Sequence, residues 1–323
     1  MTKEFELTID DGRILHVYDT APGATDRLPV LWHHGTPNIG APPAPLFDDR
    51  LGLRWISYDR PGYGGSTPEP GRTLASAAGY ASRIADALGL GRFAVMGHSG
   101  GASHALACAA LLGERVLAVL SVSGLAPYAA GGPTPRAAGD HAPYPAGGFA
   151  PHDAAGEAGR GRADREARAA DDFDWFAGMA PSCEASLRAA ARGRAAKERH
   201  EAAAAYDPEM FTPEDHAAFE GEWSWFDSVV GPAVAKGPGG LIDDDLAYVT
   251  PWGCDPAAAT APVLLVHGGK DRVAPAGHGD RLARHCPTAE LRLSPRDGHI
   301  SILPSAGAAA VEWLATEGHR RLG

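Results

Sequence analysis

The sequence predicts an α/β fold in which a doubly wound, mostly parallel sheet carries an inserted helical cap. Two observations support this prediction. Short apolar segments rich in β-branched residues alternate with segments of helical period before residue 126 and again after residue 252. Strands that alternate with helices imply right-handed crossovers, which cover both faces of a largely parallel sheet. The segment 126–252 interrupts this alternation, so we expect it to sit on the sheet as a cap.

The region before the cap shows the alternation most clearly. Asp10-Asp11-Gly12 is typical of a hairpin turn between the first two strands, and Gly89 and Gly91 end the first helix. In order, we expect strands at 5–9, 14–18, 29–33 and 54–58, a helix at 73–88, a strand at 93–96, a helix at 99–112 and a strand at 115–122.

The cap is predicted to have two parts. Residues 126–161 are dominated by Ala, Gly and Pro, bury little surface and are expected to form a loop. Residues 171–252 have a helical and aromatic pattern. The core would then comprise 1–125 and 253–323, and its second part is expected to form a strand at 262–267, a helix at 277–285, a strand at 290–293 and a helix at 307–315.

The composition is typical of a globular protein and argues against several classes. The 323 residues include 29 basic and 40 acidic side chains, which gives a formal charge of −11. The apolar content of 44% is higher than a disordered chain would have. Because phosphate binding needs a positive field, the negative charge argues against a nucleic-acid partner.

No segment is typical of a signal peptide or a membrane span. The first eight residues lack an apolar core, and the most apolar stretch, 105–125, is interrupted by Glu114 and Arg115. The four cysteines lie far apart, with neither disulfide-dense nor zinc-ligand spacing. We therefore expect a cytoplasmic protein without a membrane partner, and the sequence leaves its oligomeric state open.

The motif Gly97-His98-Ser99-Gly100-Gly101 marks Ser99 as a candidate nucleophile. A G-x-S-x-G pattern alone is weak in a chain with 41 glycines. Here it follows a predicted strand and opens a small-residue helix, where a sharp turn exposes a serine hydroxyl. The glycines leave room for the turn, and the helix N terminus favours developing negative charge. The simpler alternative is a serine that caps a helix.

Two later loops supply a base and an acid for Ser99. A serine hydroxyl needs a base to take its proton, and the base needs an acid to orient it. His299 and Asp271 each directly follow a predicted strand, and the order Ser99, Asp271, His299 is the one expected on a doubly wound hydrolase sheet. Asp297 is a weaker alternative acid, because it is too near His299 in sequence to orient the ring. Turn and surface-loop roles are the alternatives for Asp271 and His299.

The oxyanion of a tetrahedral intermediate needs preorganised N–H donors. The first candidate is the amide of Gly100, the residue after the nucleophile. The second is the amide of Thr36, in the loop that follows the strand at 29–33, where Gly35 permits close approach.

These motifs together resemble the α/β-hydrolase superfamily. His34-Gly35-Thr36-Pro37 resembles its oxyanion loop, the segment 59–66 its D-x-x-G-x-G-x-S turn, and the segment 97–101 its nucleophile elbow. Asp271 and His299 fall where its acid and base stand. The resemblance covers about 5–125 and 262–314. It implies a core of about eight strands, a helical lid and a Ser-Asp-His mechanism, similar to that of bacterial esterase-like hydrolases.

The sequence also departs from some members of the superfamily. Prolyl aminopeptidases carry a His-Gly-Gly-Pro-Gly loop, whereas Thr36 and Asn38 stand where two of those glycines would be. Dehalogenases and epoxide hydrolases have an aspartate nucleophile in place of Ser99. We therefore expect a cofactor-independent serine hydrolase that acts on a small-molecule carboxylic ester. Amide, lactone or carbon–carbon bond cleavage and perhydrolysis are alternatives on the same triad, and a non-catalytic small-molecule receptor is a further one.

Two groups of residues have weaker signals. The triplet Asp243-Asp244-Asp245 invites a metal site, but no His or Cys stands at ligand spacing, so we expect a solvated loop and no metal. Packing is the usual role of aromatic residues in helices, but some in the cap are candidates to line the substrate pocket. The pocket candidates are His33, His98, Trp175, Trp223, Trp225 and Phe226.

Overall fold

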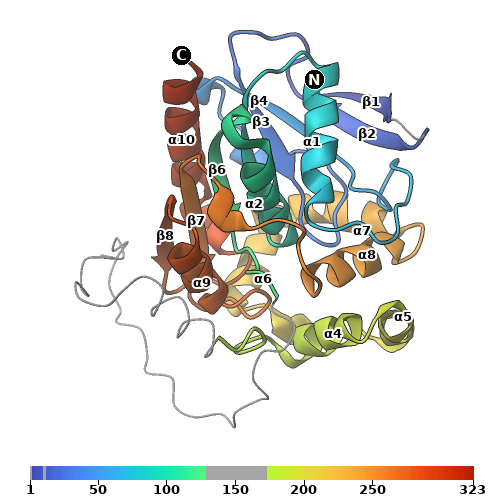
Figure 1. The fold of residues 1–323 in the computed structure, drawn as a ribbon. Coiled ribbons are helices and arrows are strands. Elements are labelled where there is room, and N and C mark those ends of the chain that lie inside the picture. The colour runs from blue at the N-terminus through green and yellow to red at the C-terminus, as the bar shows by residue number, and fades with distance from the viewer. Residues whose placement is uncertain (1, 10–11, 129–172) are drawn as a thin grey trace.

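A single sheet organises the molecule in the computed structural model, which describes residues 2–9, 12–128 and 173–323 (Figure 1). In spatial order its eight strands are β1 (Lys3–Thr8), β2 (Ile14–Asp19), β4 (Leu53–Tyr58), β3 (Leu28–His33), β5 (Phe93–His98), β6 (Val116–Val122), β7 (Val263–Gly268) and β8 (Ala289–Ser294). β2 pairs antiparallel with β1 and β4, and the other pairs are parallel. The predicted doubly wound, mostly parallel sheet is confirmed.

Helices cover both faces of this sheet. α1 (Ser76–Ala87), α2 (Gly100–Leu112) and α9 (Gly277–His285) pack on one face, and α10 (Ile302–Leu322) packs on the other (Figure 1). The central strands β3, β5 and β6 are buried along their whole length, as strands with both faces covered must be. This burial explains why their sequences are continuous apolar runs.

In the described part of the chain between β6 and β7, five helices gather at one side of the sheet, in the lower half of the view in Figure 1. They are α4 (Pro181–Ala191), α5 (Arg194–Ala203), α6 (Pro213–Glu220), α7 (Asp227–Val234) and α8 (Gly239–Tyr248). Short 3₁₀ turns at Pro208–Met210 and Glu222–Phe226 connect some of them. From residue 129 on, the expected loop at 126–161 lies outside the described residues, as do Asp10 and Asp11 of the hairpin turn.

The last helix differs most from its expected bounds. It was expected over 307–315 but runs from Ile302 to Leu322. Pro304 lies in its first turn, where proline is tolerated because no intrahelical partner is lost. In the part of the chain that the structure describes, no helix has the length and apolar character needed to cross a membrane.

Candidate active site

Ser99 lies at the sharp turn between β5 and α2. Its φ of 56° and ψ of −130° fall in a region that residues with a side chain rarely adopt. The Ser99 amide donates to Val122 O at the end of β6 (2.9 Å), which fixes the turn. The turn is so tight that a Cβ on Gly101 would overlap the backbone carbonyl of His33.

The structure brings Ser99, His299 and Asp271 into one hydrogen-bonded chain. The Ser99 hydroxyl lies 2.9 Å from His299 Nε2, and His299 Nδ1 lies 2.7 Å from Asp271 Oδ2. Asp271 Oδ1 accepts the amides of the two residues Val273 and Ala274, so the carboxylate is held in place. His299 and Asp271 come from the loops after β8 and β7, respectively. This geometry matches the one expected for a serine nucleophile, its base and an orienting acid.

The alternative acid, Asp297, has other partners. Its Oδ2 accepts hydrogen bonds from the hydroxyls of Ser294 and Ser305. It therefore stabilises the start of the loop that carries His299, and Asp271 is the carboxylate on the imidazole ring.

The acid and the base shift each other's pKa. Burial would raise the pKa of Asp271, but the nearby His299 imidazole lowers it below the ordinary value of 3.8. Burial would lower the pKa of His299, but the Asp271 carboxylate raises it above 6.5. His98 contacts the same loop without a carboxylate on its ring, and burial lowers its pKa to about 3. His98 is therefore neutral, and its Nε2–H donates to His299 O (3.0 Å).

The raised pKa of His299 predicts how hydrolysis by the proposed triad depends on pH. A base must be deprotonated to accept a proton, and the raised pKa of His299 keeps it protonated to higher pH than a free imidazole. The expected kcat/KM falls roughly tenfold per pH unit below a midpoint that lies above 6.5. A pH–rate profile checks this, and Asp271→Asn should lower the midpoint. A wild-type midpoint well below 6.5 would contradict the assignment of His299.

Asp215, at the start of α6, anchors the loop that carries His299. Its two oxygens accept three successive amides, those of residues 299–301, at 2.7–3.2 Å, and also the Ser301 hydroxyl. Burial would raise the pKa of Asp215, but hydrogen bonds from the amides of Ser301, Thr212 and Ile300 lower it below its ordinary value. This role of Asp215 was not predicted from the sequence. The local sequence is the helix-capping signature Thr212-Pro213-Glu214-Asp215, and Asp215 does form a capping box with Thr212. This capping role already explains the residue, so nothing in the local sequence indicates its contacts with the His299 loop.

A glycine next to His299 makes this anchor possible. A Cβ on Gly298 would overlap the Asp215 carboxylate, closer than any real Cβ contact. Gly298→Ala should therefore push the His299 loop away from α6, with a loss of about 1–3 kcal/mol in the free energy of unfolding and a lower kcat.

Urea unfolding and ester turnover measure both effects. The matched control is Gly79→Ala in α1, where an added Cβ meets nothing within 4 Å. It should raise stability by about 1 kcal/mol, because alanine favours a helix over glycine. Equal free energies of unfolding and equal turnover for the two variants would show that the contact between Asp215 and Gly298 does not hold the His299 loop in place.

The two oxyanion candidates lie side by side next to Ser99. A Cβ on Gly100 would lie 2.8 Å from Thr36 Oγ1, and one on Gly35 would lie 3.7 Å from Ser99 Cβ. Gly100 is the first residue of α2, where backbone N–H groups have no intrahelical acceptor. The loop at 34–37 and the α2 N terminus therefore meet beside Ser99, which is the arrangement expected of an oxyanion hole.

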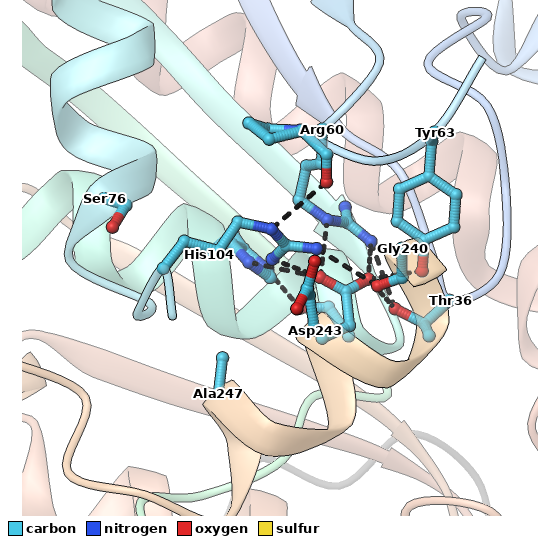
Figure 2. A network of polar contacts seen from close by, with 12 residues as sticks. Thr36, Arg60, Tyr63, Ser76, His104, Gly240, Asp243 and Ala247 are labelled. Atoms are coloured by element: carbon cyan, nitrogen blue, oxygen red, sulfur yellow. Dashed lines mark hydrogen bonds and ion pairs between the residues drawn. The ribbon is translucent and has the colours of Figure 1, made fainter. Parts of the chain in front are cut away.

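A buried polar network holds the Thr36 loop to helix α8 (Figure 2). Asp244 Oδ2 accepts the Thr36 hydroxyl (2.6 Å), the Tyr63 hydroxyl (2.8 Å) and Arg60 Nη2 (2.6 Å). Arg72 pairs with Asp244 Oδ1 at 2.6 Å, and all of these charged side chains are at most 1% exposed. Burial would raise the pKa of Asp244, but the two arginines hold it well below its ordinary value.

Arg60 connects this network to the backbone of the same loop. Its guanidinium donates to the carbonyls of His34 and Gly35 and to Thr36 Oγ1. Since Thr36 donates its own proton to Asp244, the Tyr248 hydroxyl donates to Thr36 Oγ1 (2.8 Å). The position of Thr36 beside Ser99 thus depends on a carboxylate from the α8 segment.

The expectation of a solvated loop for Asp243-Asp244-Asp245 is wrong. The triplet lies within α8, and the three residues are at most 8% exposed. Successive residues of a helix point about 100° apart, so the three carboxylates face different partners. Asp243 pairs with Arg194, Asp244 with Arg60 and Arg72, and Asp245 with Lys197. Among the described residues, no group of three or more His, Cys, Asp or Glu side chains could hold a metal ion.

Two cavities meet at Ser99. The first, about 340 Å³, passes Gly100 toward α4, α5 and α8 and is termed the Gly100-side cavity. The second, about 530 Å³, is bounded by His299, α6 and α7 and is termed the His299-side cavity. Ser99, Thr36 and Val273 line both, so the two cavities adjoin at the Ser99 hydroxyl.

The structure places only part of the expected pocket residues there. His98 and Phe226 line the His299-side cavity. The linings that the described residues form do not include His33, Trp175, Trp223 and Trp225.

Packing accounts for these four side chains. His33 Nε2 lies against Cys108 Sγ (3.5 Å) in the core under α2. The Trp175 indole donates to Ala126 O (2.8 Å), and Trp223 is 2% exposed within the cluster under α10, with Trp225 packed against it. Aromatic rings on helices are buried by packing as well as by ligand pockets, and the sequence pattern does not separate the two.

A family model described as alpha/beta hydrolase fold matches residues 29–306. No curated protein matches the sequence.

Solved structures share the whole fold at low sequence identity. An esterase from Exiguobacterium antarcticum superposes with a TM-score of 0.63 and 18% identity over 98% of this chain and 99% of that one. The enol-lactonase from Burkholderia xenovorans LB400 superposes with a TM-score of 0.62 and 18% identity over 96% of this chain and 99% of that one. A bromoperoxidase from Bacillus anthracis superposes with a TM-score of 0.60 and 16% identity over 98% of this chain and 100% of that one. At these identities the likeness concerns the fold.

Proposed function

The chain belongs to the α/β hydrolase fold family, and from its site we propose that it is a serine hydrolase that cleaves a carboxylic ester through an acyl-enzyme. The observation that carries the proposal is the hydrogen-bonded chain from Asp271 through His299 to Ser99, with distances of 2.7 and 2.9 Å. It is supported by the Thr36 loop and the N terminus of α2 at Gly100, which meet next to Ser99 and could supply two backbone amides.

The proposed reaction has two halves. Ser99 Oγ attacks the ester carbonyl while His299 Nε2 takes its proton, and the Asp271 carboxylate stabilises the imidazolium. The amides of Thr36 and Gly100 bind the oxyanion, each contributing about 3 kcal/mol of transition-state stabilisation. The intermediate expels the alcohol, which receives its proton from His299. A water molecule then attacks the acyl-enzyme by the same steps and releases the acid.

Ester, amide and lactone cleavage share these steps and differ in the leaving group. The test is a panel of p-nitrophenyl esters, matched p-nitroanilides and simple lactones at pH 8. We expect turnover of the esters, with an initial burst of nitrophenolate close to the enzyme concentration when deacylation is slow. Faster cleavage of anilides or lactones would move the proposal to those substrates. Tight binding of ligands without any turnover would point to a receptor.

A further inference from the structure

The walls of the two cavities differ in chemistry. The His299-side cavity is lined mostly by aromatic and aliphatic side chains such as Phe211, Phe219 and Ile300, with a single carboxylate, Asp227. The Gly100-side cavity also has apolar walls, but it carries three carboxylates, Glu201, Asp207 and Asp245, together with His200 and hydroxyls of α4. A substrate that spans Ser99 therefore meets one carboxylate on the His299 side and three on the Gly100 side, and these three are termed the acidic wall.

The acidic wall is a built feature, because a buried lysine organises it from behind. Lys197 Nζ, with a fully buried side chain, lies 2.6 Å from Glu201 Oε1 and 2.5 Å from Asp245 Oδ2, and it also donates to Ser186 Oγ. These contacts use its three N–H groups. Burial would lower the pKa of Lys197, but the two carboxylates raise it above its ordinary value.

The charges of this wall do not cancel. One ammonium faces two carboxylates, and Asp207 adds a third on the cavity lining. The side chains of Glu201 and Asp245 keep 18% and 12% exposure, whereas Lys197 keeps none. The charged groups that face the Gly100-side cavity are therefore mainly carboxylates, whose oxygens accept hydrogen bonds and carry more negative charge than Lys197 neutralises.

The catalytic geometry decides which part of an ester enters this cavity. His299 must reach the oxygen of the leaving group to protonate it, so the alcohol part lies in the cavity that His299 lines. The carbonyl oxygen points to the amides of Thr36 and Gly100. The remaining substituent, the acyl chain, then extends into the Gly100-side cavity.

We propose that the Gly100-side cavity selects an acyl group that carries a cationic amine, with Glu201 as a specificity-determining residue. This inference rests on the proposed ester hydrolysis and names its substrate class. An apolar acyl chain would strip water from the carboxylates without replacing its hydrogen bonds, and an anionic chain would meet like charge. A cationic amine meets neither cost.

The test compares two p-nitrophenyl esters in a matched series of chain lengths. One acyl chain ends in trimethylammonium and the other in the neutral tert-butyl group of the same shape. The wild type should favour the cationic ester by roughly tenfold in kcat/KM, after correction for the uncatalysed rates. Glu201→Gln should reduce this preference by roughly fivefold or more.

The matched control is Glu198→Gln on the same helix, α5. Glu198 is an exposed residue that pairs with Arg194 at 3.7 Å and should leave the preference unchanged. Because both esters are measured on each variant, a loss of folded enzyme cancels from the ratio.

Several results would overturn the inference. One is a wild-type preference for the tert-butyl ester, and another is an equal effect of the two Glu variants. Either leaves the proposed ester hydrolysis intact, provided that turnover needs Ser99. If neither ester is cleaved and no simple p-nitrophenyl ester is cleaved, the proposed function fails, and this inference fails with it.

Discussion

Ser99→Ala should lower ester hydrolysis by about 10⁶-fold, to the rate that binding and the oxyanion amides alone sustain. The variant keeps the amides of Thr36 and Gly100 but removes the only atom that forms the acyl-enzyme in the proposed reaction. Ser99 is half-buried, and among the described residues its hydroxyl forms a hydrogen bond only with His299. The free energy of unfolding of the variant should therefore change little. Steady-state turnover of p-nitrophenyl esters measures the effect.

The matched control is Ser123→Ala. Ser123 follows β6 as Ser99 follows β5, and its φ of 52° is also positive. Its buried hydroxyl has no hydrogen-bond partner among the described residues, so its removal should leave turnover within a few-fold of the wild type. Full activity of Ser99→Ala, measured with the same thermal unfolding midpoint as the wild type, would exclude Ser99 as the nucleophile.

Asp244→Ala should cause the largest loss of stability, about 3–5 kcal/mol in the free energy of unfolding. The change leaves Arg60 and Arg72 as buried charges without their carboxylate, and both are at most 1% exposed. It also frees Thr36, so the enzyme that remains folded should have a lower kcat. Urea unfolding and ester turnover measure the two effects.

A second variant separates the charge from the hydrogen bonds. Asp244→Asn retains an oxygen acceptor for Thr36 and Tyr63 but removes the negative charge, so its kcat should fall less than that of Asp244→Ala. The control is Asp86→Ala, which breaks an exposed pair with Arg115 and should cost far less, because solvent screens such pairs. Equal stability of Asp244→Ala and Asp86→Ala would show that the network does not hold α8 to the core.

The elements of the core could be predicted because their sequences carry local signals. A strand buried on both faces is a continuous apolar run, and its neighbours are crossover helices of regular period. Ser99, Asp271 and His299 were found for the same reason. Ser99 and Asp271 follow strands of this kind, His299 lies in the loop after the more exposed strand β8, and the carboxyl ends of parallel strands share one edge of the sheet.

The partners that hold these residues could not be predicted in the same way. Asp215 contacts the His299 loop 84 residues away, Asp244 contacts the Thr36 loop 208 residues away, and no local pattern marks such contacts. An acidic triplet is normally solvated, because burying a carboxylate is costly unless a cation is buried with it. The four cations that meet Asp243, Asp244 and Asp245 come from three separate parts of the chain, at Arg60, Arg72 and 194–197.

The most direct test of the account is the site of covalent labelling by a fluorophosphonate. The probe phosphonylates only a serine whose hydroxyl is activated by a base and whose oxyanion is stabilised. Mass spectrometry of the digested protein should find one adduct, on the peptide that contains Ser99, and Ser99→Ala should carry none. Folded wild-type protein that stays unlabelled, or that is labelled at another serine, would contradict the assignment of Ser99, His299 and Asp271 as a catalytic triad.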